Sequence, residues 1–165
     1  MGLVAEKFIS LQLFILNGDC ELDIRLNKHL INRLFMAQNR TWLAFANRKK
    51  CGHADAIHTL GFINWLMGKN IRFDIGDTVY LFMSDERKVH FKMRVIAKNC
   101  KREDSDFWIE KAPDDITYKL KLFSEYKGNA LDESELLKHA FKGGRSLQTP
   151  ICNNMTLFNY IKSVF

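Results

Sequence analysis

Residues 64–99 of the chain read NWLMGKNIRFDIGDTVYLFMSDERKVHFKMRVIAKN, and this stretch decides the fold. Within residues 79–83, Val, Leu and Met alternate with Tyr and Phe, and within residues 89–96, apolar side chains alternate with mostly polar ones. This period of two residues is typical of a β-strand with one face in solvent. The polar run at 84–88 predicts a turn between them, so the two strands form a hairpin. Gly76 permits a sharp turn before the first strand, because glycine adopts positive φ without steric cost.

The length and the distribution of charge narrow the possible classes of protein. A chain of 165 residues fits one domain with a sizeable core, and its net charge is +6. Residues 41–102 carry twelve Lys and Arg against five Asp and Glu, whereas residues 103–127 carry four against seven. The basic surface therefore lies with the central strands. It indicates an anionic partner, or it merely keeps exposed strands soluble.

Cysteine usage predicts a reduced, cytoplasmic chain. The four cysteines are far apart and form no paired spacing (Cys20, Cys51, Cys100 and Cys152). Cys51, His53 and His58 are close enough in sequence to be metal ligands, but no second Cys or His pair with finger-like spacing accompanies them. We therefore expect neither a metal nor another cofactor. The longest apolar run, residues 8–16, is too short to span a membrane, so we expect no membrane partner.

The segments around the hairpin predict an appendage and a domain. Residues 1–40 form an N-terminal appendage, in which residues 4–16 are a buried strand or helix and residues 21–38 an amphipathic helix. That helix packs on its own domain or binds a partner or a second copy of the chain. Residues 41–165 form the domain. Its further elements are a strand at 41–47, a short helix at 55–67 broken at Gly61, strands at 107–110 and 117–123, and helices at 132–141 and 153–164.

This order of elements predicts an α+β fold. We expect a strongly curved, barrel-like mixed sheet of five or more strands, flanked by short helices and preceded by an extra N-terminal helical segment.

Five pieces of the domain, in their order, resemble the EVE domains of the PUA-like group, which are relatives of the YTH domains. The pieces are TWLAFAN, FINWLMGKNIRFDIGDTVYLFMSDERKVHFKMRV, FWIE, YKLKLF and KGGRSLQTPICNNMTLFNYI. The features that carry the resemblance are Trp42, Trp65, Gly76 and Asp77 with residues 79–84, Arg94 and Val95, and Gln148, Thr149 and Pro150. The resemblance covers residues 41–165. The family has Pro or Ser where this chain has Asn47, Arg48 and Lys49, so the identity of the ligand is not carried over.

The resemblance implies a non-catalytic reader that holds a modified base, for example a methylated one, of DNA or RNA in an aromatic-walled pocket. Such a module gives specificity to a modification-dependent restriction or RNA-modification system, and its partners are nucleic acid and an associated nuclease. Two alternatives remain. One is a general RNA-binding protein without selectivity for modification, and the other is an interaction module that dimerises through residues 21–38.

The same resemblance selects candidate pocket residues. Trp65 occupies the family's tryptophan position before the hairpin and is our first choice for a pocket wall, with core packing as the alternative. Asn64, beside it, can bind a base edge. Trp42 and Phe45 have opposite parity on their strand, so at most one of them faces the pocket, and core burial is the alternative for each.

Three further candidates depend on how the strands face. Asn47 reads a base or simply makes a turn. Phe82 and Ser84 line the pocket only if their face of the strand is its floor. The candidate phosphate contacts, each with a solvated surface role as the alternative, are Arg48, Lys49, Lys50, Lys69, Arg145 and Gln148.

The sequence does not predict an enzyme. It contains no Gly-rich phosphate loop, nucleophile elbow or zinc-protease helix. Glu103, Asp104 and Asp106 are close together, but we expect them to be solvated in a charged loop at 98–106.

Overall fold

A computed structural model describes residues 39–68 and 71–165, and residues 39–165 form one compact unit. The elements predicted within residues 1–38, and Lys69, lie outside the described residues. Within the described part, no helix has the length and apolar character needed to cross a bilayer.

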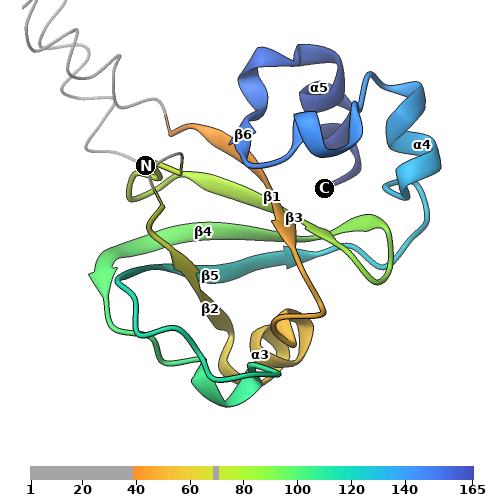
Figure 1. The fold of residues 1–165 in the computed structure, drawn as a ribbon. Coiled ribbons are helices and arrows are strands. Elements are labelled where there is room, and N and C mark those ends of the chain that lie inside the picture. Colours follow the sequence, from red (N-terminus) through yellow and green to blue (C-terminus); the bar gives the residue numbers. More distant parts are fainter. Residues whose placement is uncertain (1–38, 69–70) are drawn as a thin grey trace, which may run out of the picture. The chain divides into compact units, whose positions relative to one another are not determined.

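Six strands and several short helices make this unit an α+β domain (Figure 1). In chain order the elements are β1 (Thr41–Ala46), α3 (His53–Leu60), β2 (Phe62–Leu66), β3 (Thr78–Met83), β4 (Lys88–Cys100), η1 (Ser105–Phe107), β5 (Thr117–Glu125), α4 (Glu133–Lys138), η2 (Gly143–Ser146), β6 (Thr149–Pro150), η3 (Ile151–Asn153) and α5 (Met155–Val164), where η denotes a 3₁₀ helix.

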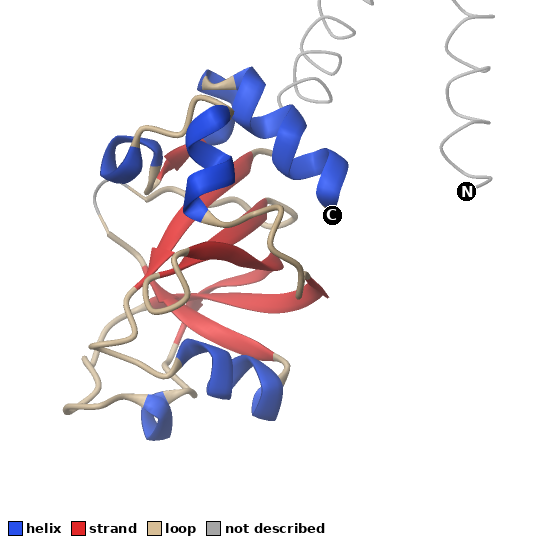
Figure 2. Cartoon of the chain, turned by 90° about the vertical axis from the view of Figure 1, so that its right-hand side faces the viewer, coloured by secondary structure: helices blue, strands red, loops and turns tan. Residues whose placement is uncertain are grey.

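The six strands form one mixed sheet in the order β2-β5-β4-β3-β1-β6. β1 and β3 are parallel, and every other neighbouring pair is antiparallel. The predicted hairpin is confirmed as β3 and β4, and the predicted mixed sheet of five or more strands is confirmed as well. The edge strands β2 and β6 are not paired with each other, so the sheet is open. Figure 2 shows it strongly twisted, with helices on both sides.

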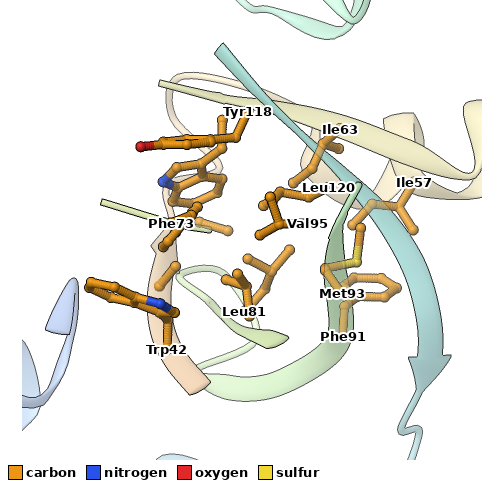
Figure 3. Close-up of a cluster of buried hydrophobic side chains, with 14 of the residues drawn as sticks. Trp42, Ile57, Ile63, Phe73, Leu81, Phe91, Met93, Val95, Tyr118 and Leu120 are labelled. Carbon is orange, nitrogen blue, oxygen red and sulfur yellow. The ribbon is translucent and has the colours of Figure 1, made fainter. Parts of the chain in front are cut away.

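Two hydrophobic cores lie on opposite faces of the sheet. The first core lies inside the curve of the sheet and is closed by α3 (Figure 3). The second lies under α4 and α5. β3 contributes Val79, Leu81 and Met83 to the first core and Tyr80 and Phe82 to the second. The expectation that β3 has one wet face is therefore wrong, because the C-terminal helices cover its other face.

The predicted helix at 55–67 is also corrected. α3 ends at Leu60, and Gly61 follows with φ 73°, its N–H donating to the carbonyl of Ile57 at 2.9 Å. Such a left-handed glycine ends a helix. Residues 62–66 then form the edge strand β2, which pairs with β5. Sequence spacing misled here because Ile63 fits both the helical period and the strand period.

Residues 107–110 do not form the strand that the sequence predicts. η1 ends at Phe107, and Trp108 makes only an isolated bridge with Cys51. Two hydrogen bonds flank this bridge, from Gly52 N to the carbonyl of Phe107 at 2.8 Å and from Ile109 N to that of Lys50 at 3.0 Å. These contacts tie the segment to the loop before α3 rather than to the sheet.

The remaining predictions are confirmed in outline. Residues 117–123 belong to β5, residues 132–141 contain the shorter helix α4, and residues 153–164 contain α5. Asn154 caps α5, since its Oδ1 accepts from Leu157 N at 3.2 Å.

A buried carboxylate joins the starts of β1 and β3. Gly76 turns the chain with φ 94°, and Asp77 follows it with 1% of its surface exposed. Its Oδ1 accepts from Arg40 N at 2.8 Å. Its Oδ2 accepts from Trp42 Nε1 at 2.8 Å and from Asp74 N at 2.9 Å. Three N–H groups that would otherwise lack partners are thus satisfied by one side chain.

We expect Asp77→Ala to lower the free energy of unfolding by about 3 to 5 kcal/mol, because it leaves buried donors without an acceptor. Urea denaturation measures this. Asp85→Ala, which removes an exposed acid from the β3–β4 turn, is the control and should change stability by less than about 0.5 kcal/mol. Equal stability of the two variants would show that the Asp77 contacts do not hold the parallel strand pair.

Candidate functional site

A cavity of about 270 Å³ lies beside Trp65, where β1, α3, β2 and two loops meet. Its apolar lining comes from Phe45, Trp65, Leu66, Ile71 and Trp108. Its polar lining comes from Asn47, Lys50, His53, Asn64, Arg102 and Gln148. Trp65 is one of the lining residues, although only 7% of its surface is exposed and it also packs in the first core. The cavity thus combines aromatic walls with a few polar groups, the usual make-up of a small-molecule site.

The loop before α3 positions two of the lining residues. Cys51 bridges to Trp108, and His53 begins α3 directly after Gly52. Gly52 is buried, and a Cβ there would lie 2.5 Å from Arg48 Nη1 and 2.8 Å from Asp55 Oδ2. A side chain at this position would therefore displace the ends of the Arg48 and Asp55 side chains, which pair with each other at 3.2 Å.

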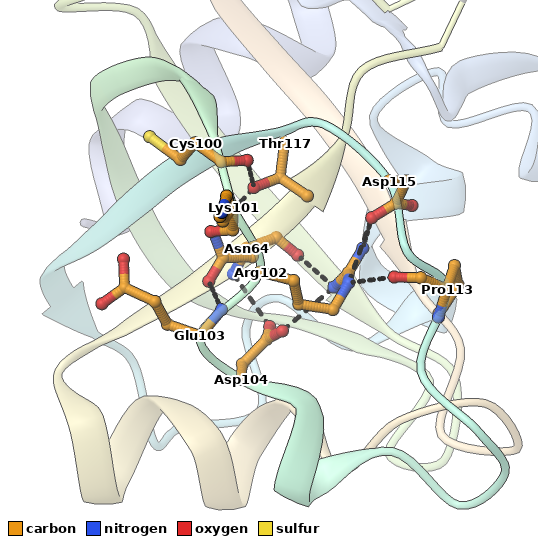
Figure 4. Close-up of polar contacts among 9 residues, drawn as sticks. All are labelled: Asn64, Cys100, Lys101, Arg102, Glu103, Asp104, Pro113, Asp115 and Thr117. Atoms are coloured by element: carbon orange, nitrogen blue, oxygen red, sulfur yellow. Dashed lines mark hydrogen bonds and ion pairs between the residues drawn. The ribbon is translucent and has the colours of Figure 1, made fainter.

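A polar network around Asn64 supports the floor of the cavity (Figure 4). The Asn64 amide nitrogen Nδ2 donates to Thr117 Oγ1 at 2.7 Å and to the carbonyl of Lys101 at 3.3 Å. Its Oδ1 accepts from Glu103 N at 3.0 Å. Both amide protons are thus committed to the protein, so these contacts favour a positioning role for Asn64 over the reading of a base edge.

Arg102 and Asp104 form hydrogen bonds with the backbone of Asn64, on the outer edge of β2. Asn64 N donates to Asp104 Oδ2 at 2.8 Å, and Arg102 Nη1 donates to the carbonyl of Asn64 at 3.2 Å. Arg102 also pairs with Asp104 at 3.0 Å and with Asp115 at 2.6 Å, and its guanidinium lies 4.6 Å from the Trp108 ring centroid. The expectation that Asp104 is solvated is wrong. The residue is fully buried, because it closes the free edge of β2.

Three buried polar atoms, each on a residue of the cavity lining, make no hydrogen bond of good geometry. They are His53 Nδ1, Trp108 Nε1 and Gln148 Oε1, and within the described residues no other buried side-chain nitrogen or oxygen is unpaired. A buried polar group without a partner costs about 1 to 3 kcal/mol. The three residues come from separate segments and line one space, so the lining of that space combines aromatic and polar side chains.

Gln148 is held in an unusual backbone conformation. Its φ is 60°, which is uncommon for a residue other than glycine, and its N–H donates to the carbonyl of Leu43 at 2.7 Å. Such strain occurs mostly where surrounding contacts enforce it, often at functional sites. The bond to β1 fixes the residue that precedes β6 at the cavity wall.

Burial lowers the pKa of His53 below its ordinary value, since the charged imidazolium would lose its hydration there. The ring is therefore neutral at neutral pH. A neutral imidazole presents one donor and one acceptor nitrogen, so Nδ1 can serve in either role according to the tautomer.

The structure brings six of the predicted site residues to this cavity: Phe45, Asn47, Lys50, Asn64, Trp65 and Gln148. Gln148, expected to contact phosphate, lies in the wall. Asn47 also makes a turn, since its Oδ1 accepts from Lys49 N at 3.0 Å.

Other predicted residues lie elsewhere. Trp42 packs in the first core and donates to Asp77. Phe82 packs in the second core and borders a neighbouring hollow of about 360 Å³, because its face of β3 is not the cavity floor. Ser84 Oγ accepts from Arg48 N at 2.8 Å. Arg145 lines a third hollow near α5.

The predicted phosphate contacts therefore differ in whether their charge is already paired within the protein. Arg48 pairs with Asp55 at 3.2 Å, whereas Lys49 and Lys50 are exposed. Of these three, only Lys50 also lines the cavity.

Sequence reasoning missed Arg102 and Trp108, and it considered His53 only as a metal ligand. A tryptophan in an otherwise charged segment was the available signal for Trp108. Arg102 and His53 gave no comparable signal, because their importance depends on burial.

The possible metal ligands do not converge. No group of three or more His, Cys, Asp or Glu side chains in the described part of the chain could hold a metal ion. The His58 ring lies 3.2 Å from Glu125, and burial raises the pKa of the Cys51 thiol to about 12. A thiol with that pKa is neither a ready metal ligand nor a nucleophile.

Comparison of this chain with protein-family models, with curated proteins and with solved structures finds no match.

We expect the stability of the protein to fall on acidification from about pH 7.5 to about pH 5.5, because His53 takes up a proton near pH 6.5 when unfolded but at lower pH when folded. His53→Leu should make the free energy of unfolding less dependent on pH in this window. Urea denaturation of both proteins across the window measures the difference. Parallel pH profiles would contradict a buried, neutral His53.

Proposed function

We propose that this protein is a non-catalytic reader of nucleic acid that holds one modified base in the cavity beside Trp65. The observation that carries the proposal is one cavity with aromatic walls whose lining includes His53, Trp108 and Gln148, three residues that each carry a buried polar atom without a partner. A nucleobase is a planar ring whose edge presents neighbouring donors and acceptors, so it matches both features.

The donor and acceptor pattern suits such an edge. Trp108 Nε1 can only donate, Gln148 Oε1 can only accept, and His53 Nδ1 adopts either role. Taking a base out of its stack costs a few kcal/mol, and stacking on aromatic side chains returns about 1 to 3 kcal/mol per base. The hydrogen bonds to the three atoms add to this, because they remove the cost of leaving those atoms unpaired.

Positive charge at the rim supports a polyanionic ligand. Lys50 is exposed and lines the cavity, and Lys49 precedes it. Arg102 contributes little net charge, since it is paired with Asp104 and Asp115. Lysines at a rim bind phosphates and add affinity without sequence information.

Selectivity for a modified base has a physical limit. A methyl group that is fully buried adds on the order of 0.8 kcal/mol, which is about a fourfold gain in affinity. Larger selectivity requires that the unmodified base leave a polar atom unpaired.

This function agrees with the resemblance of residues 41–165 to EVE domains. With it we propose that the curved sheet corresponds to the barrel-like PUA fold, that the protein acts in the cytoplasm, and that a separate nuclease acts on the nucleic acid it binds.

We expect the full chain to bind at least one of N6-methyladenosine, 5-methylcytidine and 5-hydroxymethylcytidine more tightly than the unmodified nucleosides, as measured by calorimetry. Trp108→Phe keeps an aromatic ring but removes the indole N–H, and Gln148→Met keeps a side chain of similar length but removes both polar atoms of the amide. Each should weaken nucleoside binding about 5- to 100-fold, because the base then lacks a partner.

Tyr160→Phe is the matched control. It also removes one polar atom from an aromatic side chain, but in the second core, where Tyr160 Oη donates to the carbonyl of Ala130 at 2.5 Å. It should leave nucleoside affinity unchanged. The proposal fails if none of the nucleosides binds, or if the Trp108 and Gln148 variants bind them as tightly as the unaltered protein.

A further inference from the structure

The helices leave part of one sheet face uncovered. α4 and α5 cover β1, β3 and the start of β4 on the side of the second core, but no described helix covers the same face of the rest of β4, of β5 and of β2 (Figures 1 and 2). Arg94 pairs with Lys121 across β4 and β5, and Lys121 pairs with Phe62 across β5 and β2, so these side chains share a face. The side chains on this open face are Phe62, Lys92, Arg94, Lys119, Lys121 and Phe123.

Most of the positive charge on the open face has no carboxylate partner in the part of the chain that the structure describes. Lys119 pairs with Glu103 at 2.9 Å, but within the described residues Lys92, Arg94 and Lys121 have no carboxylate at ion-pair distance. Arg94 and Lys121 are also direct cross-strand partners. Like charges placed opposite each other destabilise a sheet, so folding alone does not favour this pair. The arrangement instead suits an anionic ligand.

Aromatic rings lie among these cations. The side chain of Phe123 is 58% exposed, and its ring centroid lies 5.2 Å from Lys92 Nζ and 5.0 Å from Arg94 Cζ. On the neighbouring strand, Lys119 Nζ lies 3.8 Å from the centroid of Phe62. Phe123 is thus an exposed ring beside two cations without a carboxylate partner among the described residues, a combination that binds single-stranded nucleic acid because bases stack on the ring and phosphates bind the cations.

Residues 1–38 do not offer the matching charge. This segment contains four acidic residues (Glu6, Asp19, Glu21 and Asp23) and four basic ones (Lys7, Arg25, Lys28 and Arg33). It therefore lacks the net negative charge that the open face would favour, whereas every nucleotide of a nucleic acid supplies a phosphate.

We propose that the open face binds single-stranded nucleic acid, with phosphates on Lys92, Arg94 and Lys121 and a base stacked on Phe123. This inference goes beyond the base pocket, because the open face shares no residue with the cavity lining. It gives affinity that does not depend on modification. A second binding surface of this kind increases the length of nucleic acid that the protein contacts.

The charge contribution is tested with the full chain and twelve-nucleotide oligothymidylate and oligouridylate carrying a fluorescent label. Arg94→Gln combined with Lys121→Gln should weaken binding about tenfold at about 50 mM salt. It should also reduce the slope of log affinity against log salt by about 1.4, since two phosphate contacts are lost. Lys111→Gln combined with Lys162→Gln changes the net charge equally at exposed sites outside the open face, and it should alter neither quantity.

The stacking contribution is tested with Phe123→Ala. It should weaken oligonucleotide binding about 5- to 100-fold and leave the salt slope unchanged, because no charge is lost. Ile116→Ala is the control, since Ile116 is an apolar side chain of similar exposure, 60%, outside this face. A duplex of the same length should bind more weakly than the single strands and should be insensitive to Phe123→Ala.

The open face and the cavity can fail separately. The open-face variants should bind modified nucleosides like the unaltered protein, and Trp108→Phe should bind the unmodified oligonucleotides normally. The inference is overturned if the oligonucleotides do not bind, or if they bind the open-face variants and the control variants equally well. Either result would leave this face to residues 1–38 or to a protein partner.

Discussion

The carboxylate of Asp77 joins β1 to β3, and the other parts of the domain depend on that pairing. Parallel strands need a long connection between them, and here the connection contains α3 and β2. Both elements line the candidate cavity. Holding the starts of β1 and β3 together therefore also fixes where α3 and β2 can lie. Trp42 serves this purpose, because its indole N–H is one of the three donors that Asp77 accepts.

Satisfied and unsatisfied polar groups lie close together at the cavity. Asn64, Arg102 and Asp104 are buried, and the hydrogen bonds and ion pairs among them and with Asp115 and Thr117 hold the edge strand β2 in place. In contrast, His53, Trp108 and Gln148, which also line the cavity, each carry a buried polar atom without a partner. A rigid, fully bonded support beside unpaired groups is what a pre-formed binding site requires, since the support keeps those groups from turning to find partners within the protein.

The two faces of the sheet also differ in a way that bears on function. Inside the curve, Met93, Val95 and Leu120 are buried in the first core, whereas on the outer face Arg94 and Lys121 occupy the neighbouring positions. The alternation along β4 and β5 thus places apolar residues inward and cations outward. Because α4 and α5 cover the outer face at β1, β3 and the start of β4, and no other described helix covers the rest, Arg94 and Lys121 are exposed.

Elements with a strong local signal could be predicted from the amino-acid sequence alone. The alternation at 79–83 and 89–96 predicted the hairpin, Gly76 predicted the turn before it, and the last helix was predicted within two residues of its start. It also indicated Trp65, Phe45 and Asn47 as neighbours of a site. Only the tertiary structure decided that residues 62–66 are a strand, that both faces of β3 are buried, and that Trp42 is structural. It alone brought His53, Trp108 and Gln148 to one cavity. The reason is that burial and hydrogen-bond satisfaction depend on segments far apart in the chain, whereas sequence periodicity reports only on local neighbours.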